Sequence, residues 1–87
     1  MRNNTWYYQK QYSDVFEALG NRGFVVSAFD GPELKGRGAF KLNISRKGGR
    51  DLTDDDMSNI EDVLRGFEGS YFFKSKDPWV ATYVLLP

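Results

Sequence analysis

The chain contains no cysteine, so its 87 residues have to fold without a disulfide bond. A domain of this length buries only about 60–65% of its unfolded surface, which leaves a small core. Two tryptophans, five tyrosines and seven phenylalanines supply large buried areas for such a core, and we expect some of them to stay exposed for binding. The sequence therefore predicts one packed domain over residues 1–87.

Strand-like segments alternate with two helical segments along this domain. The aromatic-rich residues 5–11 indicate a first strand, and further strands are expected at residues 24–29, 40–45, 71–75 and 79–86. The resulting order, β-α-β-β-α-β-β, predicts an α+β fold. Its mostly antiparallel five-stranded sheet would carry two helices on one face, as a ferredoxin-like βαββαβ core with one extra C-terminal strand.

The two helices differ in how well the sequence specifies them. The first is short and is expected to begin at the N-cap Ser13 and to stop near Gly20. The second begins at the N-cap Thr53, and Asp56 three residues later predicts a capping box. An apolar stripe at three- and four-residue spacing follows on the second helix, formed by Met57, Ile60, Leu64 and Phe67.

The charges of this formally neutral chain are segregated along the sequence. Residues 35–50 carry six positive charges and no negative one, and residues 51–62 carry six negative charges and no positive one. Such a dipole can steer the chain toward a partner of matching polarity. This pattern indicates binding rather than catalysis.

Several kinds of chemistry are disfavoured by composition. Histidine and cysteine are both absent, which removes the usual general base, the thiolate nucleophile and the common zinc ligands. The run from Asp54 to Asp56 could bind a divalent cation, but the first turn of a helix explains these acids better. We expect no enzymatic activity, no cofactor and no metal site. No apolar run reaches the ~18–20 residues of a membrane span, so a cytoplasmic location is expected.

Nucleic-acid binding is the alternative interpretation. Glycines beside basic residues at 36–38 and 47–50 could cradle phosphate, although neither leads into a helix as a phosphate loop does. The segment 37–44 invites comparison with an RNA-binding strand, but its apolar side chains alternate as core residues should. In this alternative the basic segment 35–50 contacts phosphates through Lys41, Arg46, Lys47 and Arg50.

The C-terminal strands provide the other binding feature. Trp79 and Tyr83 share one face of a strand, where they could anchor a protein interface or could pack into the core. An exposed C-terminal strand edge would also allow a homodimer.

The favoured hypothesis is a non-enzymatic protein that docks on a larger protein or nucleoprotein. Its size and composition are typical of small phage and mobile-element inhibitors of host machinery, including anti-CRISPR proteins. The partner-binding residues expected from the sequence are Lys41, Arg46, Lys47, Arg50, Asp55, Glu61, Trp79 and Tyr83.

Overall fold

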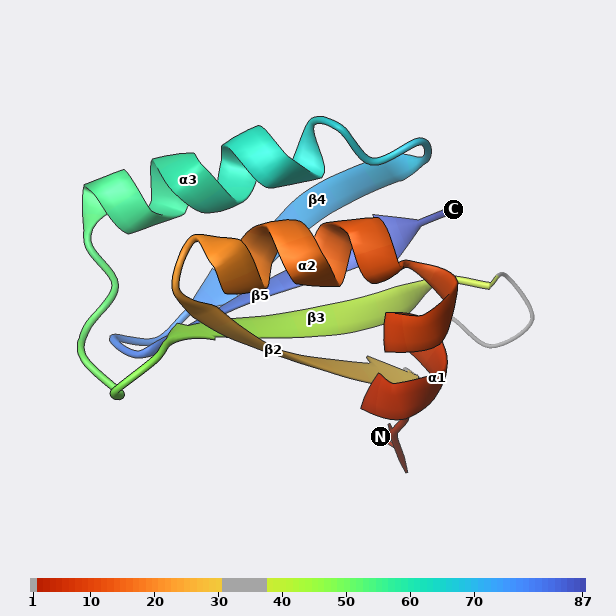
Figure 1. Ribbon diagram of the computed structural model, residues 1–87, viewed down its shortest axis with the longest axis horizontal. Helices are drawn as coiled ribbons and strands as arrows, with labels where there is room; N and C mark the ends of the chain where they lie inside the picture. The colour runs from red at the N-terminus through yellow and green to blue at the C-terminus, as the bar shows by residue number, and fades with distance from the viewer. Residues whose placement is uncertain (1, 31–37) are drawn as a thin grey trace.

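The computed structural model describes residues 2–30 and 38–87, and within them it contains one five-stranded sheet and three helices (Figure 1). All neighbouring strands are antiparallel, in the order β1-β2-β3-β5-β4. The predicted α+β class is therefore confirmed. The elements are β1 (Arg2–Asn3), α1 (Thr5–Gln11), α2 (Ser13–Asn21), β2 (Phe24–Asp30), β3 (Phe40–Arg46), α3 (Asp54–Leu64), β4 (Ser70–Lys76) and β5 (Val80–Leu86).

The order of the strands explains how the predicted ferredoxin-like arrangement is built. Helix α3 connects β3 to β4, and β5 lies between these two strands, which makes a split βαβ unit. In a βαββαβ chain the first strand would occupy this central position. Here the last strand, β5, occupies it. The spatial order of the four strands is therefore that of the ferredoxin-like sheet, but the strand that comes first in a βαββαβ chain comes last in this one.

The expected first strand is wrong, because residues 5–11 form helix α1. The side chain of Asn3 accepts a hydrogen bond from the backbone N–H of Thr5 at 3.1 Å, which turns the chain into the helix. Tyr8 is buried, its ring stacks on Phe40 with centroids 4.1 Å apart, and its hydroxyl donates to Asp30. Packing against the end of the sheet thus overrides the strand preference of consecutive aromatic residues.

The core lies between the sheet and the two helices α2 and α3, which run side by side over one face (Figure 1). Burial confirms the core face predicted for β3, although Lys41 on the other face is buried too. It also confirms the apolar stripe predicted on the second helix, although α3 ends at Leu64, before Phe67. Each such side chain stabilises the fold by about 1.5–3 kcal/mol when fully buried. Fully buried residues include Leu19, Phe40, Leu42, Ile44, Ile60, Leu64 and Leu85, while Met57 and Phe67 are partly buried against them.

The two long helices begin differently. At α3 the hydroxyl of Thr53 accepts the N–H of Asp56 at 3.1 Å, and the carboxylate of Asp56 accepts the N–H of Thr53 at 2.9 Å. This is the predicted capping box. The expected cap at Ser13 is wrong: α2 follows Tyr12 without a side-chain cap, and the Tyr12 ring stacks on Phe40 instead.

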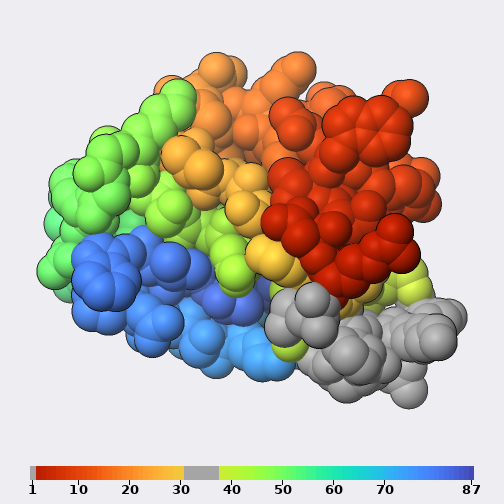
Figure 2. Space-filling model, turned by 90° about the horizontal axis from the view of Figure 1, so that it is seen from below, coloured from red at the N-terminus to blue at the C-terminus, as the bar shows by residue number. Residues whose placement is uncertain are grey.

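The sheet face opposite the helices is viewed in Figure 2. Val25 on β2 and Phe72 on β4 are exposed there, and Thr82 donates to Asn43 at 2.9 Å across the centre. Most of the expected loop at 31–38, with Lys35 and Arg37, lies outside the described residues. Within the described ranges, no helix is long and apolar enough to cross a membrane.

Candidate functional site

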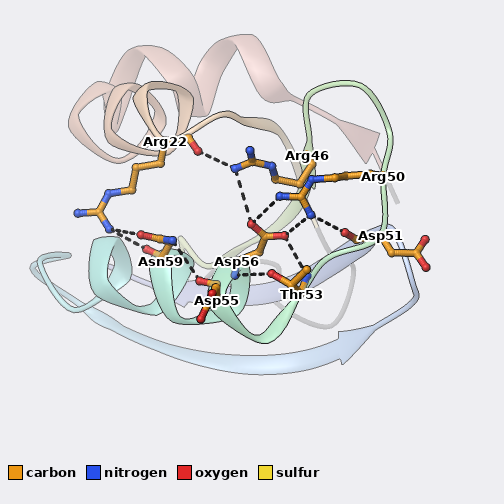
Figure 3. Close-up of polar contacts among 8 residues, drawn as sticks. All are labelled: Arg22, Arg46, Arg50, Asp51, Thr53, Asp55, Asp56 and Asn59. Carbon is orange, nitrogen blue, oxygen red and sulfur yellow. Dashed lines mark hydrogen bonds and ion pairs between the residues drawn. The ribbon is translucent and has the colours of Figure 1, made fainter.

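The basic residues expected to bind a partner mostly hold one end of the fold together (Figure 3). A guanidinium nitrogen of Arg46 donates to the carbonyl of Arg22 at 2.8 Å, and the group lies 5.1 Å from the ring centre of Phe24. The ammonium of Lys47 donates to the carbonyl of Gly20 at 3.2 Å, where it caps the negative end of α2. These contacts tie the end of β3 to the end of α2.

Asp56 forms ion pairs with two of the basic side chains at this end of the molecule. Its two oxygens accept from Arg50 at 2.8 and 3.2 Å, and Arg46 lies 3.7 Å away (Figure 3). Burial alone would raise the pKa of Asp56, but the hydrogen bonds from Arg50 and Thr53 outweigh it and lower the pKa below its ordinary value. The folded chain therefore pairs two residues of its basic segment, Arg46 and Arg50, with one residue of its acidic segment, Asp56.

The other expected charged residues are placed as follows. Lys41 is buried on β3, on the sheet face away from the helices, and Asp55 is exposed in the first turn of α3. Glu61 accepts hydrogen bonds from the hydroxyls of Tyr71 at 2.9 Å and Tyr83 at 2.5 Å. Of these three charged side chains, only Asp55 is placed to meet a partner without rearrangement.

The two aromatic residues expected as anchors have opposite environments. Trp79 is 55% exposed beside the turn between β4 and β5. For Tyr83 the structure shows the core alternative, because this residue is fully buried and is not available as an anchor. β5 is a central strand, and Tyr83 points to the face that the helices cover, where burial and Glu61 both raise its pKa.

Helix α1 presents an aromatic surface that the sequence interpretation missed. We call it the α1 surface, and it consists of Trp6, Tyr7, Lys10 and Gln11. Trp6 is 74% exposed, and the ammonium of Lys10 lies 5.2 Å from its ring centre. The amide of Gln11 donates to the hydroxyl of Tyr7 at 3.1 Å. Large aromatic side chains held by such i,i+4 contacts are preorganised for a protein interface.

Helix α1, which carries the α1 surface, is attached to β2 by backbone and side-chain hydrogen bonds. The N–H of Asn4 donates to the carbonyl of Ala28 at 2.9 Å, and the N–H of Ala28 donates to the hydroxyl of Thr5 at 3.0 Å. The buried ring of Tyr8 fixes the middle of the helix against the core. The exposed aromatic residues therefore stand on a fixed support although α1 is a short helix.

A cleft of about 320 Å³ adjoins this surface, between the α1–α2 junction and the end of α3. Gln11 belongs both to the cleft and to the α1 surface, which makes the two continuous. The rings of Tyr12 and Phe67 meet edge to face with centroids 5.8 Å apart, and the acidic residues Asp14 and Glu68 also line the cleft. Aromatic rings beside carboxylates suit a basic side chain from a partner.

The α1 surface had a detectable signal in the sequence. Trp6 and Lys10, Tyr7 and Gln11, and Tyr8 and Tyr12 are three successive pairs spaced four residues apart. Such spacing is typical of a helix, since residues four apart are neighbours on its surface. This helical spacing was missed in the sequence analysis because consecutive aromatic residues favour a strand.

No protein-family model, curated protein or solved structure matches the chain. Across residues 2–30 and 38–87, no three acidic side chains converge in a way that could hold a metal ion. The candidate site is thus defined by its exposed aromatic residues and its cleft.

Proposed function

We propose that the chain is a non-enzymatic binding protein that docks on a larger protein or nucleoprotein through the α1 surface and its cleft. The observation that carries the proposal is the 74% exposure of Trp6 on a helix that is fixed to the sheet. Exposed tryptophan and tyrosine beside a pocket are typical of the few residues that dominate a protein interface. Asp14 and Glu68 favour a partner that inserts a lysine or arginine side chain into the cleft.

Trp79 marks a second exposed aromatic site at the opposite end of the sheet. Val80 pairs with Ser45 near the start of β2, whereas α1 packs near the end of β2. Trp79 follows Pro78, whose carbonyl accepts the N–H of Leu52 at 2.8 Å. The α1 surface is favoured because it combines several exposed side chains with a cleft.

Nucleic-acid binding through the basic segment is less well supported by the geometry. Arg46, Lys47 and Arg50 each contact protein groups, and Lys41 is buried. Phosphate binding would have to compete with these contacts. Inhibition of host machinery, as by phage or anti-CRISPR proteins, is the finer form of the docking proposal and is supported by chain size and composition.

Affinity capture from a lysate of the native host tests the proposal with matched tryptophan variants. Trp6→Ala should reduce the captured partner, because loss of a central anchor weakens binding by about thirtyfold. Trp79→Ala is the control, since it removes an exposed tryptophan from the other end of the sheet. Both variants should melt like the parent chain. Nuclease treatment should leave a protein partner bound.

Three outcomes contradict the proposal. Equal capture by the parent and Trp6→Ala would show that the α1 surface is not the docking site. Loss of capture after nuclease treatment, together with tight binding of short oligonucleotides that is lost in Lys47→Glu/Arg50→Glu, would establish the nucleic-acid alternative. A partner lost only in Trp79→Ala would move the site to the opposite end of the sheet.

A further inference from the structure

Strand β4 forms an outer edge of the sheet. In the described part of the chain it pairs with β5 on one side and with no strand on the other. Six of its seven residues are exposed. The backbone N–H and C=O groups along an unpaired edge form a template for another strand.

The β4 edge carries aromatic residues on both of its faces. Phe72 lies on the face away from the helices, opposite Val84, and is 48% exposed. Phe73 lies on the helix face, with its ring edge-on to Tyr83 at 5.6 Å, and is 49% exposed. A strand added to this edge would bury the exposed parts of both rings.

We propose that β4 pairs antiparallel with β4 of a second copy of the chain, with Phe72 facing its own copy on the twofold axis. In this register Tyr71 of each copy faces Phe73 of the other. All three central pairs are then aromatic, and cross-strand aromatic pairs are among the more stabilising in sheets. The irregularity in the β4–β5 pairing lies between Phe73 and Ser75, beyond this central segment.

The side chains of β4 favour this register among the symmetric alternatives. Centring the pairing on Tyr71 or on Phe73 would leave one aromatic pair instead of three. In the proposed register Lys74 faces Ser70 at the end of the paired segment, and Lys76 lies beyond that segment, so both lysines are several residues from their own copies. Centring the pairing on Lys74 would place two ammonium groups directly opposite each other, which destabilises a sheet. Lysines of this kind protect a strand edge from pairing with other strands, and here they remain compatible with the pairing centred on Phe72.

The dimer goes beyond the docking function and uses different residues. β4 and β1 are at opposite edges of the sheet, and α1 follows β1 in the chain and packs against β2. Both α1 surfaces would remain exposed in the dimer, which would make the assembly bivalent. Failure of the dimer and failure of α1 docking are thus separately observable.

Sedimentation velocity of the unmodified chain gives the first test. We expect a concentration-dependent species of about twice the 10.0 kDa chain mass. Phe72→Lys should weaken the association by at least about tenfold, because it places like charges opposite each other on the twofold axis. Trp6→Ala should leave it unchanged. A chain that stays monomeric at its highest soluble concentration overturns the proposal without any variant.

The absence of cysteine allows a test of register. In Phe72→Cys, the Cα atoms of the two thiol residues would lie about 4.5–5.5 Å apart, within disulfide range. Diamide should therefore produce a covalent dimer on non-reducing gels. In the control Lys76→Cys, the two thiol residues would be about 27 Å apart along the strands and should not join. Equal crosslinking of the two variants would overturn the register.

Discussion

Arg50 and Asp56 form a bidentate ion pair in which the two guanidinium nitrogens lie 2.8 and 3.2 Å from the carboxylate oxygens. The same carboxylate closes the capping box with Thr53 and lies 3.7 Å from Arg46. One buried acid thus joins the end of β3, the following turn and the start of α3. We expect this end of the molecule to depend on Asp56 more than on any other charged side chain described there.

Replacing Asp56 should destabilise the fold strongly. Asp56→Ala removes the acceptor for Thr53 and for both nitrogens of Arg50, so we expect a loss of about 2–4 kcal/mol in the free energy of unfolding. Asp54→Ala is the matched control, because Asp54 is an exposed acid in the same helical turn. It should cost less than about 1 kcal/mol. Urea unfolding measures both, and equal midpoints would refute the role of Asp56.

The lowered pKa of Asp56 predicts a specific loss of stability in acid. A carboxyl whose pKa falls on folding stabilises the fold above its unfolded pKa, here 3.8. This contribution is lost as the pH falls through the lower, folded pKa. Asp56→Asn should therefore be less stable than the parent at neutral pH and lose less stability below about pH 4. The measurement is the urea unfolding midpoint of the parent and of Asp56→Asn as a function of pH. An equal fall of the two midpoints below about pH 4 would contradict the prediction.

The buried hydroxyl of Tyr83 should contribute to stability through Glu61. Tyr83→Phe keeps the ring but leaves one oxygen of Glu61 without its donor, so we expect a loss of about 1–2 kcal/mol. Burial, followed by the bond to Glu61, raises the pKa of Tyr83 above its ordinary value of 10.0. The stabilisation is therefore complete below pH 10 and declines as the pH rises further. Tyr83→Phe should show a shallower alkaline decline in its unfolding midpoint, and an unchanged decline would exclude Tyr83 as its cause.

Leu64 should be among the core residues most sensitive to truncation. It belongs to the apolar stripe and is fully buried at the end of α3, so Leu64→Ala should cost roughly 2–4 kcal/mol. Ser58→Ala on the exposed face of the same helix is the control and should change stability by less than about 0.5 kcal/mol. Thermal unfolding of the two variants provides the comparison. A parent-like midpoint for Leu64→Ala would mean that the stripe does not support the core.

The sequence alone determined those features that depend on neighbours within a turn or a strand. The spacing of Thr53 and Asp56 specified the capping box, because its two hydrogen bonds join residues three apart. The alternation through Phe40 and Leu42 specified the buried face of β3, since successive side chains point to opposite sides of a strand. These interactions are local, so the order of the residues contains the information needed to predict them.

Only the tertiary structure decided features that depend on partners distant in the chain. Residues 5–11 form a helix because Tyr8 stacks on Phe40 and donates a hydrogen bond to Asp30. Tyr83 is a core residue because β5 is a central strand of the sheet. Arg46 and Lys47 became internal ties because the β2–β3 pairing brought them to the end of α2. Whether a side chain is exposed or paired depends on which strands and helices pack together in the folded chain. The spacing of residues within one segment does not contain that information.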